Sequence, residues 1–182
     1  RQMCIRDRYE APVKSIGNST TTPRDLENDL DVWIIQIALA ESVAARLRKH
    51  GFKCKTVEIT VRDNGLYSFS RQIHLRQPTN ITNEIVTAAF QLFKDNYKWE
   101  HPIRSLGIRA ADLVLDDIPV QLDLFGNQEK KEKLEKLDRT VDEIRRRFGY
   151  FSIQRAAMYQ DKVLSHLEAG THTVHPHSYF HG

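Results

Sequence analysis

Apolar side chains return along this chain with two different periods, and each period predicts a different kind of element. In residues 28–50 they recur every three or four positions, which is the spacing of an amphipathic helix. Basic residues crowd the last turn of that stretch, and Gly51 stands where a helix C-cap glycine belongs. Residues 85–97 repeat the helical spacing, and three residues could provide the N-cap of this second helix: Thr79, Asn80 and Thr82.

Strict alternation of apolar and polar residues predicts strands. Residues 53–62 and 66–76 alternate, and the sequence Asp63-Asn64-Gly65 between them indicates a tight turn, because Asn and Gly tolerate positive φ. Residues 14–22 predict a strand or an extended arm, and residues 103–115 predict the strand that closes the domain. The order is therefore β-α-β-β-α-β, an α+β domain whose two helices can cover only one face of a four-stranded sheet.

The second hairpin strand carries aromatic residues in its apolar phase. We expect Tyr67 and Phe69 in the core, and an alanine at position 69 should then unfold the domain. Arg71 falls in the same phase and interrupts it, either because a bulge re-aims this side chain or because the strand twists off the core there.

The uncovered face of the predicted sheet is polar and mildly basic. It would carry eight polar or charged residues: Thr56, Thr60, Arg62, Ser68, Ser70, Gln72, His74 and Arg109. Hydroxyls, amides and guanidinium groups are the usual partners of phosphate oxygens, so this face is a candidate phosphate-binding surface.

Composition narrows the function little. The net charge of +3 permits an anionic partner without requiring one. The two cysteines, Cys4 and Cys54, give neither a disulfide framework nor a zinc-ligand spacing, which fits a reducing cytoplasm. No apolar run approaches the roughly 20 residues that span a bilayer, so we expect no membrane partner.

Two segments carry a family resemblance. Residues 14–19, KSIGNS, and 103–109, IRSLGIR, resemble the first and last strands of the "little finger" of Y-family translesion DNA polymerases, of the polymerase IV and UV-damage-repair type of Gram-positive bacteria. The resemblance covers roughly residues 11–149. It implies a β-α-β-β-α-β domain that holds the primer–template duplex by its backbones, in a monomeric protein of DNA repair and damage tolerance.

The pentapeptide 121–125, QLDLF, resembles the motif with which bacterial replication and repair proteins bind the sliding clamp, and in this family such a motif follows the last strand. Its clamp-binding residues would be Gln121, Leu122, Leu124 and Phe125, with the apolar side chains filling a cleft. The alternative is a loop whose Leu124 and Phe125 fold back on the domain's own core.

Carried over by position, the resemblance also implies which residues contact DNA. One DNA strand would be lined by Lys14, Ser15, Gly17, Ser19 and Thr20. The other would meet Ser70, Arg71, Gln72, Arg104 and Arg109. For Gly17 a packing role, and for Arg104 a structural role at the sheet edge, are the alternatives.

No segment of this chain resembles the catalytic palm of the family, whose carboxylates hold two metal ions. We expect Mg²⁺ only in the palm of a parent polymerase, no cofactor in this chain, and no polymerisation by this chain alone. Asp63 and the pair Asp116-Asp117 are interpreted as loop formers rather than as metal ligands.

The pattern divides the chain into five segments. Residues 1–10 would be a junction or truncated linker, 11–115 the DNA-binding domain and 116–128 the linker with the clamp motif. Residues 129–165 would be a helical extension and 166–182 a histidine-rich tail without a metal.

The first helix of the extension, 129–148, is charged, has a narrow apolar seam and ends at Gly149. The seam could pack on the domain or receive another protein. The arginine run 145–147 is interpreted as a solvated helix end, with DNA contact as the alternative.

Two other functions remain open from the sequence. One is a stand-alone adaptor that binds DNA and the clamp without catalysis. The other is an RNA-recognition module, which would need exposed aromatic residues on its sheet. The expected burial of Tyr67 and Phe69 disfavours the latter.

Overall fold

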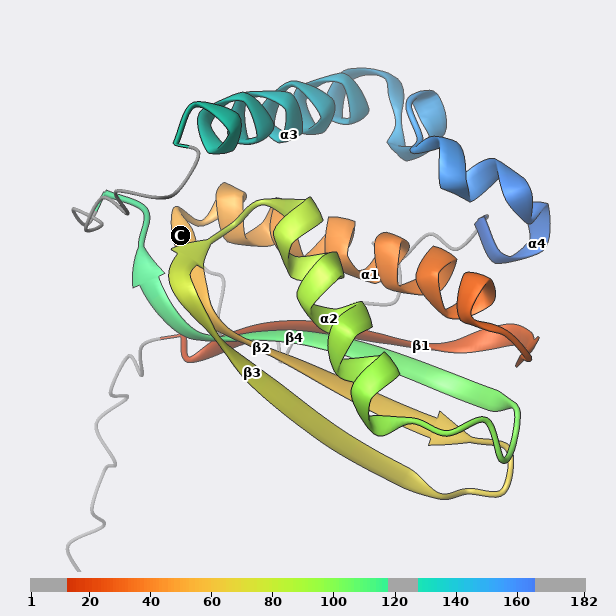
Figure 1. The fold of residues 1–182 in the computed structure, drawn as a ribbon. Helices are drawn as coiled ribbons and strands as arrows, with labels where there is room; N and C mark the ends of the chain where they lie inside the picture. Colours follow the sequence, from red (N-terminus) through yellow and green to blue (C-terminus); the bar gives the residue numbers. More distant parts are fainter. Residues whose placement is uncertain (1–12, 118–127, 166–182) are drawn as a thin grey trace, which may run out of the picture.

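The computed structural model describes residues 13–117 and 128–165 of the 182-residue chain. Four strands and two helices follow one another in the first of these ranges, in the predicted order (Figure 1). They are β1 (Ser15–Leu26), α1 (Asp29–Lys49), β2 (Phe52–Asp63), β3 (Ser68–Thr79), α2 (Thr82–Asn96) and β4 (Ile103–Leu115). The predicted α+β class is confirmed.

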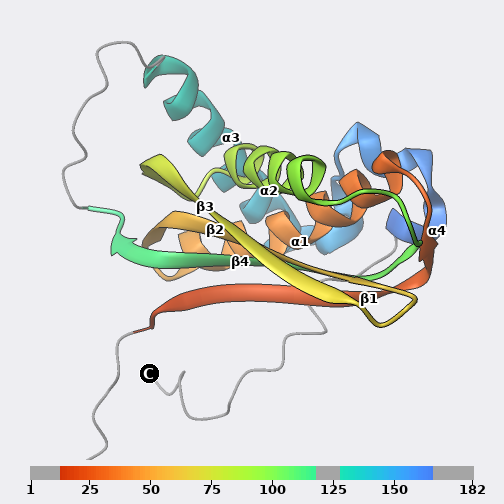
Figure 2. The ribbon, with the colours of Figure 1, turned by 60° about the horizontal axis from the view of Figure 1, so that its bottom comes forward.

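The strands form one antiparallel sheet in the order β1-β4-β2-β3, so β1 and β3 are its edges. α1 and α2 lie on the same face, and no described helix covers the opposite face (Figures 1 and 2). The core lies between the sheet and these helices, and its sheet side includes the buried Val57, Ile59, Val61, Leu106 and Ile108.

α1 begins and ends where short-range signals place it. The Asn28 side chain accepts a hydrogen bond from the backbone N–H of Asp31 at 2.9 Å and so caps the helix. At the other end Gly51 has a φ of +68°, a conformation that glycine adopts without a Cβ clash. The predicted helix and its terminal glycine are confirmed.

The cap of α2 comes from a distant part of the chain. Its N-cap position is Ile81, which makes no side-chain capping bond, so the prediction of Thr79, Asn80 or Thr82 was wrong. Instead, Asp138 Oδ2 accepts a hydrogen bond from the backbone N–H of Thr82 at 2.7 Å. A carboxylate 56 residues away supplies the acceptor that a neighbouring hydroxyl usually supplies.

The β2–β3 hairpin turns through an unexpected residue. Leu66, rather than Gly65, takes positive φ, at +70°. The backbone N–H of Leu66 donates to Asp63 O at 3.4 Å, and that of Asp63 donates to Tyr67 O at 3.0 Å. These bonds define a three-residue loop whose third residue is left-handed. Tyr67 therefore lies at the hairpin end, 64% exposed, and its predicted core position was wrong, whereas Phe69 packs against the core.

A helical extension follows. It consists of α3 (Gln128–Phe148), the 3-10 turns η1 (Tyr150–Ser152) and η2 (Ala156–Gln160), and α4 (Lys162–Ser165). Met158 and Leu164 enter the core, and Gly149, with a φ of +95°, ends α3 as predicted. None of the described helices has the length and apolarity to cross a bilayer.

Ion pairs attach α3 to the helix layer. Arg48 of α1, whose side chain is 7% exposed, pairs with Asp138 at 3.1 Å and with Asp142 at 2.6 Å. Glu41 of α1 pairs with Arg145 at 3.0 Å, so Arg145 is not the solvated helix-end residue that its arginine run suggested. Among the α3 side chains that the structure describes, only Asp138 is buried. α3 therefore contacts the helix layer through a polar side and not through an apolar one.

Candidate nucleic-acid interface

The open face of the sheet consists of alternate residues from all four strands (Figure 2). The strand registers align these residues in rows across β1, β4, β2 and β3. In that order the rows are Ser15, Ala111, Thr56 and His74; Gly17, Arg109, Glu58 and Gln72; Ser19, Gly107, Thr60 and Ser70; and Thr21, Ser105, Arg62 and Ser68. Among these positions only Ala111 is apolar. The face offers hydroxyls, the amide of Gln72, glycine backbone and a few charges.

Two glycines on neighbouring strands leave two positions near the middle of this face without projecting side chains. A Cβ at Gly107 would lie 3.1 Å from Ser19 Cβ and 3.6 Å from Thr60 Cβ. A Cβ at Gly17 would lie 3.2 Å from Arg109 Cβ. Glycine within a strand allows a ligand to approach the backbone closely, so a phosphate could lie between the side chains that flank these two positions.

Positive charge on the face comes from Arg62 and Arg109, which are both exposed. Arg109 Nε lies 3.6 Å from Glu58 Oε2, and the Arg109 side chain remains 55% exposed. Such an exposed pair stabilises by about 1 kcal/mol or less, so a phosphate can compete for the guanidinium. Glu58 lies in the same phase as Thr60 and therefore on this face, and its charge makes the face less basic than the eight polar residues expected there suggested.

One corner of the face is closed by its own side chains. Thr56 was expected at the surface but is only 4% exposed. Its hydroxyl donates to Asp112 Oδ2, and it lies 3.1 Å from His74 Nδ1. Asp112 has a φ of +52°, an irregularity of β4 that brings its carboxylate to this corner. The Thr56 hydroxyl is therefore occupied by structural bonds.

β1 is supported from the helix layer beside Gly17. Arg46 of α1 donates from its NH2 group to the Gly17 carbonyl at 2.7 Å. Burial lowers the pKa of this guanidinium from its ordinary value, yet an arginine remains charged at neutral pH. The bond holds the edge strand β1 in place at Gly17, where no side chain projects from the open face. The sequence did not indicate this hydrogen bond, because Arg46 has the position of an ordinary basic residue at the end of a helix.

Residues 13–124 match the impB/mucB/samB family C-terminal domain. The chain belongs to this family. DNA polymerase IV of Acetivibrio thermocellus is 45% identical over 158 residues, which are 87% of this chain and 40% of that protein. DNA polymerase IV 2 of Bacillus subtilis is 36% identical over 148 residues, 79% of this chain and 35% of that protein. The chain thus spans about two fifths or less of the length of these relatives.

A solved structure is also similar to this impB/mucB/samB domain. It is a chain from a complex of the beta-clamp processivity factor and the little finger domain of PolIV. The two share 15% sequence identity and a TM-score of 0.47, over 62% of this chain and 99% of that one. The family match and the polymerase IV relatives confirm the resemblance to the C-terminal part of a Y-family polymerase.

The registers divide the predicted DNA contacts of the family domain by face. Six lie on the open face: Ser15, Gly17, Ser19, Ser70, Gln72 and Arg109. Lys14 is exposed immediately before β1. The structure brings these residues to one surface, and their contact with DNA stays a prediction.

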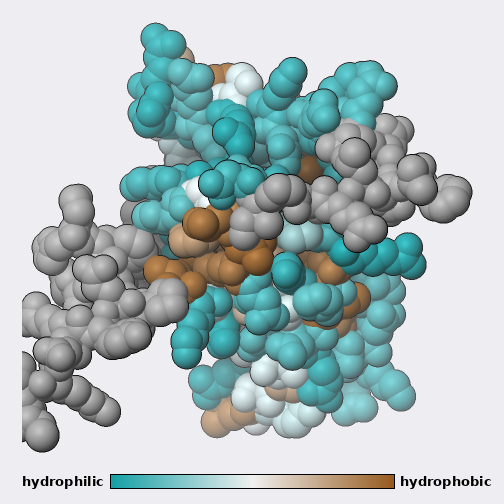
Figure 3. Space-filling model, turned by 90° about the vertical axis from the view of Figure 1, so that its left-hand side faces the viewer, coloured by the Kyte–Doolittle hydropathy of each residue, from teal (hydrophilic) through white to brown (hydrophobic). Residues whose placement is uncertain are grey.

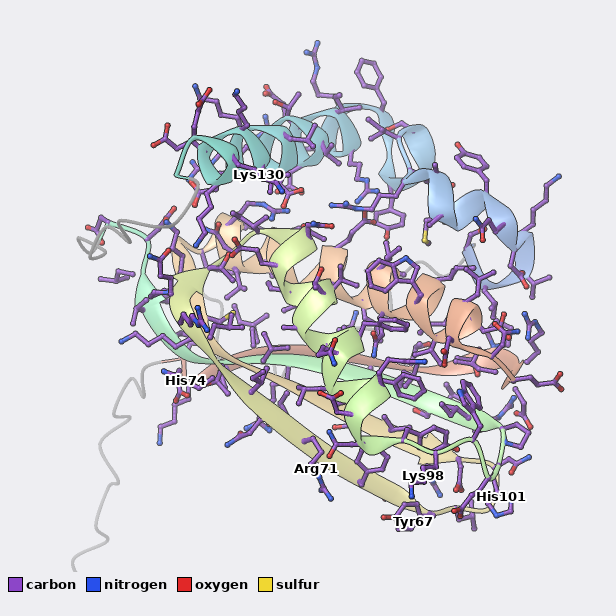
Figure 4. The ribbon with its side chains drawn as sticks, in the orientation of Figure 1. Tyr67, Arg71, His74, Lys98, His101 and Lys130 are labelled. Carbon is purple, nitrogen blue, oxygen red and sulfur yellow. The ribbon has the colours of Figure 1, made fainter. Side chains whose placement is uncertain are left out.

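Thr20 and Arg71 belong to the other phase of their strands. Thr20 pairs with Leu106 and Arg71 pairs with Ile59, both of which are core residues. The register is unbroken at Arg71, so no bulge re-aims it. Because β3 is an edge strand, Arg71 nevertheless stays exposed, with its guanidinium carbon 5.5 Å from the centroid of the Phe69 ring (Figure 4).

Arg104 lies where β2 and β4 shift register by one residue, so it is the unpaired residue of a bulge. Its NH1 group lies 3.3 Å from Asp25 Oδ1, and both side chains are partly exposed. This ion pair supports the structural role that the sequence left open for Arg104, beside phosphate contact.

The carboxylates interpreted as loop formers make structural contacts. Asp116 pairs with Lys53 at 2.8 Å and with Arg139 at 3.0 Å, and Asp63 Oδ1 accepts from the backbone N–H of Tyr67 at 3.0 Å. Within residues 13–117 and 128–165, no group of three or more His, Cys, Asp or Glu residues could hold a metal ion. The described carboxylates therefore do not fit a two-metal centre.

The predicted clamp-binding residues Gln121, Leu122, Leu124 and Phe125 lie outside the described residues, as do the histidines of the tail. The surface near the start of that segment is described. β4 ends at Leu115, which is 52% exposed, and apolar surface gathers on this side of the molecule (Figure 3).

Proposed function

We propose that this chain is the DNA-holding and clamp-recruiting part of a translesion polymerase of the polymerase IV type. The observation that carries this proposal is the chemistry of the open face, whose rows hold many hydroxyls, the Gln72 amide, two glycines and two arginines, beside the single carboxylate of Glu58. Such groups bind phosphate oxygens, and phosphate contacts position a protein on a duplex without reading its sequence. A surface that holds the backbone in this way suits a polymerase that must accept damaged templates.

The dimensions of the sheet favour contact with both DNA backbones. Neighbouring strands lie about 4.8 Å apart, so the three spacings from β1 to β3 span roughly 14 Å. This width is close to the roughly 12 Å of a major groove. One edge strand can therefore meet one backbone while the other edge meets its complement. Lys14, Ser15, Gly17 and Ser19 would serve the first, and Ser70 and Gln72 the second.

Salt dependence tests this proposal. The few cations of the face should neutralise about two or three phosphates, so log K should fall with log salt at a slope of roughly −2 to −3. We expect the Arg109→Ala variant to lose about one unit of that slope and to bind duplexes of different sequence equally weakly. Fluorescence anisotropy with a labelled primer–template duplex measures both quantities. Lys98→Ala, which removes an exposed cation between α2 and β4, is the matched control.

An Arg109→Ala variant that binds with the parent's affinity and salt slope would contradict the proposal for this face. A strong preference of the parent chain for one duplex sequence would contradict it as well, because phosphate contacts carry no sequence information.

The proposed clamp contact is the pentapeptide 121–125. Leu124 and Phe125 would fill an apolar cleft of the clamp while the Gln121 amide satisfies a polar edge. Replacing Leu124 and Phe125 with alanine should abolish binding to an immobilised bacterial sliding clamp and leave the melting temperature unchanged. A large fall in melting temperature would instead support packing of these residues on the domain's own core.

The wider activity belongs to the longer protein that the relatives represent. We propose template-directed nucleotide transfer with Mg²⁺ held by palm carboxylates outside this chain, error-prone synthesis during an SOS-type damage response, and a monomer in the cytoplasm. Primer extension past an abasic site tests this, since removal of residues 13–165 from the longer protein should lower processivity and spare single-nucleotide addition.

A further inference from the structure

The first helix of the extension carries an apolar stripe that the domain leaves partly uncovered. The stripe consists of residues at steps of three and four, the a and d spacing of a coiled-coil seam: Leu134, Leu137, Val141, Ile144 and Phe148. None of these five side chains is buried, and Leu137 and Phe148 are 54% and 69% exposed. An apolar seam of this kind normally packs against another helix.

One flank of the stripe already faces the domain. In the heptad that places Leu137 at d, the e positions are Lys131, Asp138 and Arg145. Asp138 and Arg145 bind Arg48 and Glu41 of α1, and Lys131 donates to Gln77 at the end of β3 at 2.6 Å. α3 therefore contacts the domain through the side that carries its e positions. The apolar stripe consequently lies beside this contact and does not point into the core.

The opposite flank is basic. The g positions of the same heptad are Lys133, Thr140 and Arg147, and all three are exposed. Lys133 pairs with Glu129 one turn away at 2.7 Å, where both side chains are more than 70% exposed. Arg147 lies over the Phe148 ring, with its guanidinium carbon 5.5 Å from the ring centroid. The g flank thus carries a net positive charge, because Glu129 offsets only one of its two cations.

A cavity of about 130 Å³ opens between the stripe and the domain. Its lining includes Leu137, Val141 and Ile153, together with Arg48 and Arg145. Gln154 also lines it, and Nε2 of that side chain is buried without an acceptor among the residues that the structure describes. A buried N–H without an acceptor is costly, so the cavity favours a ligand that brings an oxygen.

We propose that the stripe is the docking site of an acidic amphipathic helix from another protein. Charges at e and g positions choose the partner of a helical seam, and here the accessible flank is positive. A second copy in antiparallel pairing would set Lys133 and Arg147 against the same two cations. In parallel pairing, the g positions of the second copy would have to meet the e positions of the first, and the domain covers those e positions. A helix with apolar a and d residues and glutamates beside them matches both the stripe and the flank, and a glutamate could reach Gln154.

The test uses the 182-residue chain and two synthetic peptides of 21 residues. Both have Ile at a and Leu at d; one has Glu at e and g and the other has Lys, so that each peptide repels itself and stays monomeric. By isothermal titration calorimetry we expect the Glu peptide to bind one to one, at least about tenfold more tightly than the Lys peptide. Leu137→Ser should weaken this binding at least about tenfold. Leu66→Ser, which changes another exposed leucine, 71% exposed at the far hairpin, is the control.

The double variant Lys133→Glu, Arg147→Glu should reverse the preference and bind the Lys peptide more tightly. Equal affinity for both peptides, no binding of either, or a Leu137→Ser variant that binds like the parent would overturn the proposal. A dimer in sedimentation that Leu137→Ser abolishes would assign the stripe to a second copy. If the double variant lost affinity for a DNA duplex and kept its peptide preference, the flank would belong to DNA instead.

Discussion

Replacing Asp138 with alanine should destabilise the domain to which α3 is attached. Asp138 is 5% exposed, and its carboxylate serves two elements of the domain at once. Oδ2 accepts from the backbone N–H of Thr82 at 2.7 Å and from Arg48 NH1 at 3.1 Å. Oδ1 lies 3.4 Å from Arg155 NH2. The substitution therefore removes the cap of α2 and one anion from a buried ion-pair cluster.

The size of the loss follows from these two contributions. Loss of an N-cap costs about 1 kcal/mol. Removing one partner of a buried ion pair costs about 3–5 kcal/mol when the other charge is left alone. Arg48 is not left alone, because its Nε and NH2 groups still reach Asp142 at 2.6 and 3.0 Å. We therefore expect a total near 3 kcal/mol, which lowers the melting temperature by about 6–12 °C for a chain of this size.

Urea unfolding followed by tryptophan fluorescence measures this loss, because Trp33 and Trp99 both contact aromatic residues of α2. Asp138→Asn keeps an acceptor for the helix cap and should lose roughly half as much. Glu143→Ala is the matched control, since Glu143 is a 62%-exposed acid of the same helix and should change stability by less than about 0.5 kcal/mol. A loss below about 1 kcal/mol for Asp138→Ala would contradict a stabilising role of this carboxylate, and α3 would then not unfold together with the domain.

Three further substitutions test local features. Leu66→Gly should raise the free energy of unfolding by about 0.5–1 kcal/mol, because it relieves a left-handed leucine that is 71% exposed; urea unfolding measures it. Gly107→Ala should cost about 1 kcal/mol by the same assay and weaken duplex binding in anisotropy, because its Cβ would lie 3.1 Å from Ser19 Cβ. Bonds from Arg24 lower the folded-state pKa of Asp161 below its ordinary 3.8, so the stability that this carboxylate adds is present above about pH 4 and lost as pH falls through the lowered value. In urea titrations between about pH 6 and pH 2, Asp161→Asn should therefore show a smaller acid-induced loss than the parent.

Features that depend on short stretches of chain could be predicted from the sequence. Asn28 and Gly51 delimit α1 because a cap and a C-terminal glycine act within one helical turn. The alternation of β2 and β4 gave the composition of the open face, since a strand has only two faces. The family resemblance added the expected function of that face.

Features that depend on distant residues could not be predicted in this way. Nothing near α2 in the sequence signals that Asp138 will cap it, because the bond depends on how α3 packs. Tyr67 followed the alternating pattern but lies exposed at the hairpin end, since the turn closes one residue later than Asn64-Gly65 suggested. Arg71 shares the core phase yet stays exposed because β3 is an edge strand, a fact of sheet order.

The most direct test of the central claim is to map where a DNA duplex touches the domain by NMR. Amide spectra of the ¹⁵N-labelled chain, titrated with primer–template duplexes of two unrelated sequences, report the contact surface. We expect shift changes at Gly17, Ser19, Gly107 and Ser70 that are the same for both sequences and fade with salt. Changes confined to α2 or α3, or a pattern that differs between the two sequences, would contradict a backbone grip by the open face.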